Sequence, residues 1–131
     1  MKFTREGISS FPLQHFQKFG ILCCRRVAYL TKDKRLAKAL TKLERSLGPP
    51  IDERMRRDAF NAANSAYVDI ASRQHDKTIE EAVARTFVCA SAGFANPNLL
   101  GNLEFVLSQA ESLSLTEIRD IEDELLKQIE P

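Results

Sequence analysis

Apolar residues recur at spacings of three and four positions along almost the whole chain, and alternating strand patterns are nearly absent. This spacing places apolar side chains on one face of an α-helix. Glycine and proline break the pattern at 48–50, and a second break follows at 95–98. The pattern predicts helices over 10–31, 33–47, 53–74, 79–93, 98–110 and from 114 to near the end of the chain. We therefore expect one all-α domain, a compact bundle of five or six helices, with residues 1–10 as a candidate N-terminal arm.

Two of the predicted helices carry charge opposite an apolar stripe, as surface helices of a bundle do. In the helix over 33–47, the stripe is Leu36, Leu40, Leu43 and Leu47, and the opposite face carries Lys34, Lys38, Lys42 and Arg45. In the last helix, the stripe is Ile118, Ile121, Leu125 and Ile129, and Asp120, Glu122, Asp123 and Glu124 lie mostly outside it. The helix over 79–93 is apolar nearly all round, which predicts a place at the centre of the bundle.

The helix over 53–74 has a stripe of small residues. Its inner face is Met55, Ala59, Ala62, Ala66 and Ile70, and Arg54, Arg57, Asn61, Asn64 and Ser65 face outward. Arg56 points by helical phase towards the apolar side. It is either a rim residue whose charged end reaches water or an anchor for a binding partner, because arginine is common in interface hot spots.

Length and composition bound the class of protein. A chain of 131 residues with 44% hydrophobic and 28% charged residues can bury a core without disulfides or metal. No apolar run approaches the ~20 residues that cross a bilayer, and no signal peptide is recognisable, so the expected location is the cytoplasm. Cys23, Cys24 and Cys89 have neither a disulfide pattern nor zinc-ligand spacing, and we expect them to be buried thiols.

Charge is divided along the chain. Residues 1–60 hold 14 of the 19 basic and 6 of the 18 acidic side chains, a net charge of +8, whereas residues 61–131 have a net charge of −7. Such asymmetry between halves indicates binding partners rather than a fold.

Catalytic signatures are missing from the sequence. His15 and His75 are isolated, and we expect structural or solvated roles for both. The chain has no phosphate-binding glycine loop, zinc-protease motif or nucleophile elbow. The carboxylates of the last helix fit a solvated acidic face better than a metal site. We therefore expect a protein that is not an enzyme, with no catalytic residues, cofactor or metal.

The basic segment from Lys34 to Arg57 has three interpretations: a solvated face, a surface for an acidic protein or for the chain's own acidic helix, and a row that tracks nucleic-acid phosphates. The nucleic-acid interpretation is weaker because the row lacks interleaved aromatic residues and an evident helix-turn-helix.

The acidic last helix likewise has three interpretations. It is an outer helix of the bundle, a partner for the basic helix within one chain or between two copies, or a mimic of nucleic acid that steers a cationic partner.

One stretch resembles a known family. Asp33-Lys34-Arg35 starts a helix that runs through Ala37-Lys38-Ala39-Leu40 towards Gly48, and Arg57-Asp58-Ala59-Phe60 opens an alanine-rich helix. Over residues 24–95 this is similar to immunity proteins encoded beside bacterial polymorphic toxins, which are small and all-helical. The resemblance implies a helical architecture and, less directly, inhibition of a toxin. The chain departs from the family in having no tryptophan and in carrying Asn61 and Asn64 where histidines are expected.

The leading hypothesis is a non-enzymatic protein-interaction module. Its most specific form is an immunity-like inhibitor that binds a partner protein through charged helix faces. The candidate binding residues are Arg54, Arg56, Arg57, Asp120, Glu122, Asp123 and Glu124. The alternative is nucleic-acid binding through Lys34, Lys38, Lys42 and Arg45. Opposite charges on one molecule also allow association of two copies, and no membrane partner is expected.

Overall fold

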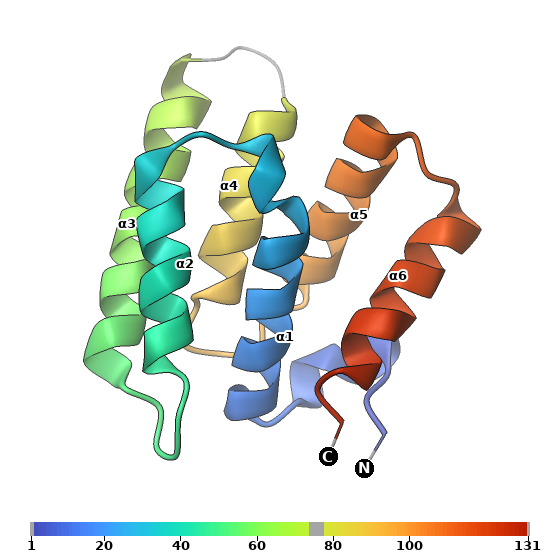
Figure 1. The fold of residues 1–131 in the computed structure, drawn as a ribbon, viewed down its shortest axis with the longest axis horizontal. Helices are drawn as coiled ribbons and strands as arrows, with labels where there is room; N and C mark the ends of the chain where they lie inside the picture. The colour runs from blue at the N-terminus through green and yellow to red at the C-terminus, as the bar shows by residue number, and fades with distance from the viewer. Residues whose placement is uncertain (1, 74–77, 131) are drawn as a thin grey trace.

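The computed structural model describes residues 2–73 and 78–130, and within these ranges the chain is an all-helical bundle without strands (Figure 1). The elements are η1 (Arg5–Ser10), α1 (Leu13–Val27), η2 (Ala28–Leu30), α2 (Lys34–Ser46), α3 (Glu53–Arg73), α4 (Ile79–Ala90), α5 (Asn98–Glu111) and α6 (Leu115–Lys127). The all-α prediction is confirmed. With the short 3₁₀ helices η1 and η2 included, the described residues contain more helices than the predicted five or six.

Capping side chains start the helices where the sequence places them. Asp33 accepts a hydrogen bond from the Arg35 amide at the start of α2, and Asp52 accepts one from the Met55 amide at the start of α3. Ser114 and Glu117 form a capping box before α6, at the predicted start of the last helix. Each cap satisfies an amide that has no partner inside its own helix, which fixes where the helix begins.

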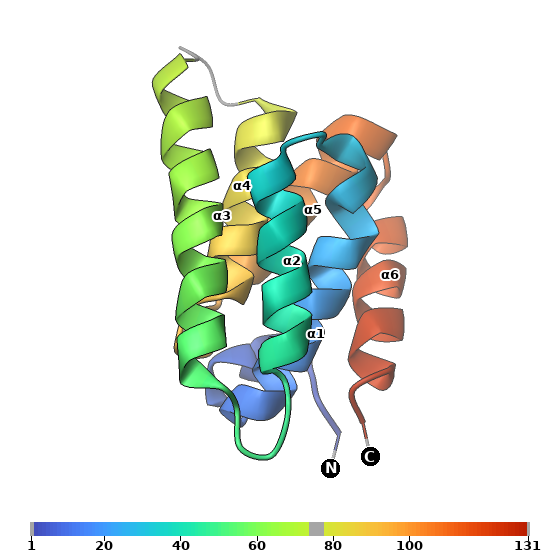
Figure 2. The same cartoon turned by 60° about the vertical axis from the view of Figure 1, so that its left-hand side comes forward.

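The centre of the bundle is α4, as predicted. It packs against α1, α3 and α5, and Figures 1 and 2 both show it enclosed by the other helices. The approach to α1 is close because Gly20 has no side chain. A β-carbon at Gly20 would lie 2.8 Å from the β-carbon of Ala90. The three cysteines are buried free thiols, as expected, and burial raises the pKa of each.

The candidate N-terminal arm packs onto the bundle. Phe3 and Ile8 are buried, and the Phe3 ring lies edge-on to Phe11 at a centroid distance of 4.8 Å. The Phe3 amide donates to the Glu130 carboxylate at 3.4 Å, so this segment meets the end of the chain. None of the helices in the described ranges is long and apolar enough to cross a membrane.

A carboxylate clamp joins α1 and η2 to the end of α5. Arg26 donates to both oxygens of Glu111 at 2.6 and 2.7 Å, and the Tyr29 hydroxyl donates to the same carboxylate at 2.6 Å. These hydrogen bonds stabilise the charged form and lower the pKa of Glu111 to about 2.

Replacing Glu111 with glutamine is expected to lower the free energy of unfolding at pH 7 by about 1 kcal/mol, a typical value for a partly exposed charge-assisted pair. Because the folded-state pKa is depressed, the stabilisation is present above the ordinary pKa near 4.5 and is lost as pH falls towards 2. Urea denaturation of the parent protein and the variant measures the loss in the free energy of unfolding at pH 7 and at pH 3. Glu80→Gln, on an exposed residue of α4, is the matched control. An equal loss at both pH values would contradict the clamp.

Candidate protein-binding surface

Four cations follow the outer side of α2. Lys34, Lys38 and Arg45 are exposed and have no ion-pair partner among the described residues. Lys42 is half-buried, with its Nζ atom 3.5 Å from a carboxylate oxygen of Asp58 on α3. The predicted row therefore exists on the surface, but one of its four members is already engaged inside the chain.

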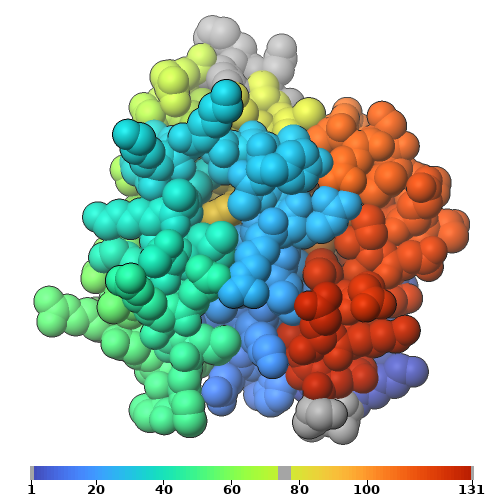
Figure 3. Space-filling view, in the orientation of Figure 1, coloured from blue at the N-terminus to red at the C-terminus, as the bar shows by residue number. Residues whose placement is uncertain are grey.

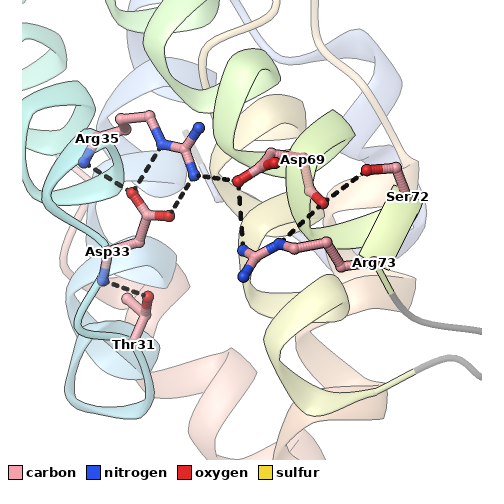
Figure 4. A network of polar contacts seen from close by, with 6 residues as sticks. All are labelled: Thr31, Asp33, Arg35, Asp69, Ser72 and Arg73. Carbon is pink, nitrogen blue, oxygen red and sulfur yellow. Dashed lines mark hydrogen bonds and ion pairs between the residues drawn. The ribbon is translucent and has the colours of Figure 1, made fainter.

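A polar network neutralises the other cation at the start of α2 (Figure 4). The Arg35 guanidinium donates to Asp33 at 2.8 Å and to Asp69 of α3 at 3.0 Å, and Asp69 also pairs with Arg73 at 3.3 Å. The hydrogen bonds that Arg35 donates to Asp33 and Asp69 raise the pKa of Arg35 further above its ordinary value. This network ties the start of α2 to the end of α3, so Arg35 has a structural role.

Arg56 is buried, which contradicts its interpretation as a rim residue that reaches water, whereas its interpretation as an anchor for a partner stays a prediction. Its Nη1 atom donates to the Ser91 carbonyl at 2.7 Å, and its guanidinium pairs with Glu53 at 3.1 Å. Gly93 lies close to the guanidinium, since a β-carbon added to Gly93 would lie 3.2 Å from the Cζ atom of Arg56. Arg56 therefore satisfies a carbonyl at the end of α4 and holds the following loop in place, rather than reaching water.

Arg54 and Arg57 are exposed on the first turns of α3, as predicted, and no described residue forms an ion pair with either. Arg57 borders a surface hollow of about 390 Å³ between α3 and the loop after α4. The lining is mostly apolar and consists of Arg56, Arg57, Phe60, Asn61, Ala92, Gly93 and Phe94. Phe94 is 60% exposed. Sequence analysis missed Phe94, although an aromatic residue beside Gly93 just before a predicted break is the available signal.

The acidic helix is less uniform than predicted. Asp120, Asp123 and Glu124 are exposed on α6, but the Glu122 side chain is completely buried, which corrects its predicted place on the outer face. Its carboxylate lies 3.7 Å from Arg5 of η1, and neither of its oxygens has a hydrogen-bond partner among the described residues. Burial and the neighbouring Glu104 raise the pKa of Glu122 to about 7. Glu122 is therefore not a binding residue on the surface.

Among the described residues, the basic helix α2 and the acidic helix α6 form no ion pair with each other. The ion pairs of α2 run to α1 and α3, and those described for α6 run to Arg5. Figure 3 shows α2, in cyan to green, and α6, in red, on the same side of the molecule with α1, in blue, between them. The intramolecular interpretation of the two charged faces is therefore wrong.

No protein-family model matches the chain, and no curated protein or solved structure matches it either.

The histidines and carboxylates offer no metal cluster in the described ranges. His15 lies against the Phe3 ring at a centroid distance of 4.9 Å, and its Nδ1 atom is buried. His75 lies outside the described residues.

Proposed function

We propose that the chain is a non-enzymatic protein-interaction module that binds an acidic partner protein through the outer faces of α2 and α3. One observation carries the proposal. Most arginines of the N-terminal half have acidic partners in the chain, such as Arg25 with Glu44 and Arg26 with Glu111. Five exposed cations on α2 and the first turns of α3 have none among the described residues. They are Lys34, Lys38, Arg45, Arg54 and Arg57, and we call them the free cation set.

A protein partner fits this surface better than nucleic acid. The neighbouring hollow is apolar and has an exposed phenylalanine, a composition that favours protein contacts over phosphates. Nucleic-acid binding through Lys34, Lys38, Lys42 and Arg45 stays as the rival hypothesis.

The resemblance to immunity proteins supports a more specific form of the proposal. In that form, the partner is a toxin and the chain inhibits it. The exposed acidic residues of α6, Asp120, Asp123 and Glu124, would then steer a cationic region of the same partner. If the partner is a second copy of the chain, the acidic residues of α6 on one copy would contact the free cation set of the other and form a homo-oligomer.

The double reversal Arg54→Glu/Arg57→Glu is expected to abolish retention of the acidic partner. Tagged chain is purified from its native host at low and high ionic strength, and retained proteins are identified by mass spectrometry. Salt should release the partner because exposed charges are screened beyond roughly 10 Å at 0.1 M salt. Lys18→Glu/Lys127→Glu makes the same change in net charge at two other exposed positions and should retain the partner.

Two results would contradict the proposal. Equal loss in both double variants would show dependence on net charge rather than on this surface. A gel shift of a duplex or single-stranded oligonucleotide that is lost in Lys38→Glu/Lys42→Glu would assign the basic row to nucleic acid instead.

A further inference from the structure

The hollow beside Arg57 is held in shape by buried contacts. Arg56 donates a hydrogen bond to the Ser91 carbonyl, and Gly93 packs on the Arg56 guanidinium. Ser91 donates through its own hydroxyl to the Phe87 carbonyl at 2.7 Å. The loop that carries Phe94 is therefore anchored to both α3 and α4. A site that is already formed loses little conformational entropy when a ligand binds.

The chemistry of the hollow is divided between its two sides. Phe60, Ala92 and Phe94 supply apolar surface, and Arg57 and Asn61 supply polar groups at the α3 edge. Exposed aromatic surface next to an unpaired arginine is the composition of interface hot spots, in which an apolar anchor is surrounded by polar contacts. A volume of about 390 Å³ is near the lower end of ligand pockets, which suits one inserted side chain.

From this geometry we infer that the hollow receives one aromatic or large aliphatic side chain from an acidic segment of the partner. The flanking charge selects this occupant. Arg54 and Arg57 are exposed on α3 without partners in the described chain, so a carboxylate next to the inserted side chain on the α3 side would meet uncompensated positive charge. The inference rests on the proposed function and adds the anchor residue that the partner must carry.

The test uses a defined set of synthetic 12-residue peptides. Each has an Asp/Glu/Gly/Ser background with Phe, Leu or Ala at the central position, and a Lys-rich version carries the central Phe. Binding is measured by fluorescence polarisation with the full chain. We expect the acidic Phe peptide to bind at least 10-fold more tightly than the acidic Ala peptide, and the Lys-rich peptide not to bind. Nuclear magnetic resonance signals of the Phe60 and Phe94 rings should shift on binding.

Phe94→Ala should weaken the acidic Phe peptide about 10-fold and leave the Ala peptide unchanged. Val68→Ala is the matched control because Val68 is also an exposed apolar residue, 55% exposed on α3, but does not line the hollow. Both variants remove exposed side chains, so both should unfold like the parent protein.

The outcomes separate the two proposals. If Arg54→Glu/Arg57→Glu weakens the peptides but Phe94→Ala and the Phe-to-Ala peptide exchange do not, the charged surface stands and the anchor site is wrong. If none of the acidic peptides binds at millimolar concentration, this inference is overturned, whereas the proposed function still depends on the partner retained from the host. Concentration-dependent self-association that disappears in Phe94→Ala would assign the hollow to a second copy of the chain and overturn the acidic-segment inference.

Discussion

Replacing Gly20 with alanine is expected to lower the free energy of unfolding by up to about 2 kcal/mol, even though alanine is the better helix former. The added β-carbon would lie 2.8 Å from the Ala90 β-carbon and 3.1 Å from its α-carbon. Neither atom can move by a rotamer change, so α1 and α4 must separate at the centre of the bundle. Overpacking of this kind costs roughly 1–3 kcal/mol, and the gain of about 1 kcal/mol in helix propensity offsets only part of it.

The control for this prediction is the same substitution at Gly101. That residue lies inside α5, and nothing lies within 4 Å of the position of its β-carbon. Gly101→Ala should therefore raise the free energy of unfolding by about 1 kcal/mol through helix propensity alone. Urea denaturation followed by circular dichroism measures both variants. Changes of the same sign in both would show that the α1–α4 approach tolerates a methyl group.

The helix boundaries could be predicted because local chemistry fixes them. Caps at Asp33, Asp52 and Ser114 act within a few residues of sequence, so the sequence contains the whole interaction. The central position of α4 was also predictable, since a helix that is apolar all round must be covered on all sides. The candidate surface was only half predictable. Arg54 and Arg57 are outward as expected, but Phe94 joins them through the tertiary path of the loop after α4.

Two buried charges show why the rest could not be predicted. On α3, Arg56, Ala59, Ala63, Ala66 and Ile70 form the buried stripe, and on α6, Ile118, Glu122, Leu125 and Ile129 lie at the same four- and three-residue spacing as Leu36, Leu40, Leu43 and Leu47. Periodicity alone would place Arg56 and Glu122 inside. In most helices the tendency of charged side chains to face water is a better guide than periodicity. For this reason the predicted apolar stripe of α6 contained Ile121 in place of Glu122.

Which charges of the two halves stay uncompensated could not be predicted for a different reason. Pairs such as Arg26–Glu111 and Arg5–Glu122 join residues far apart in sequence, one from each half of the chain. Part of the predicted +8 and −7 is therefore neutralised across helices. The net charge of a segment does not show which cations stay free. The free cation set follows only from which helices are neighbours.

Glu122 is expected to make the protein less stable as pH rises from about 4.5 to above 7. The groups that face it are Arg5 on η1, Glu104 on α5, Arg119 on α6 and Cys23 on α1. Burial contributes most to the raised pKa, and the charge of Glu104 comes next, while Arg5 and Arg119 act in the opposite direction. The negative charge of Glu104 repels an ionised Glu122, which favours protonated Glu122 in the folded state.

The direction in which stability changes with pH follows from proton binding. Between the ordinary pKa near 4.5 and the folded-state pKa of about 7, the folded chain holds a proton on Glu122 that the unfolded chain has lost. Stability therefore falls across this interval and is constant, for this group, above it. At roughly 1.4 kcal/mol for each pKa unit, the total loss is about 3 kcal/mol.

Glu122→Gln removes the titration and keeps the size and the polarity of the side chain. We expect the variant to match the parent protein at pH 4, where both side chains are neutral, and to exceed it by about 2–3 kcal/mol at pH 8. Urea denaturation at half-unit pH steps measures the difference. Asp123→Gln is the neighbouring control, because Asp123 also lies 3.7 Å from Arg5 but is exposed, and it should show no gain at pH 8. Parallel stability curves for the parent and Glu122→Gln from pH 4 to pH 8 would show that Glu122 is already ionised in the folded protein. Arg5 would then hold a buried carboxylate, and η1 would be fixed to α6 by charge rather than by apolar packing alone.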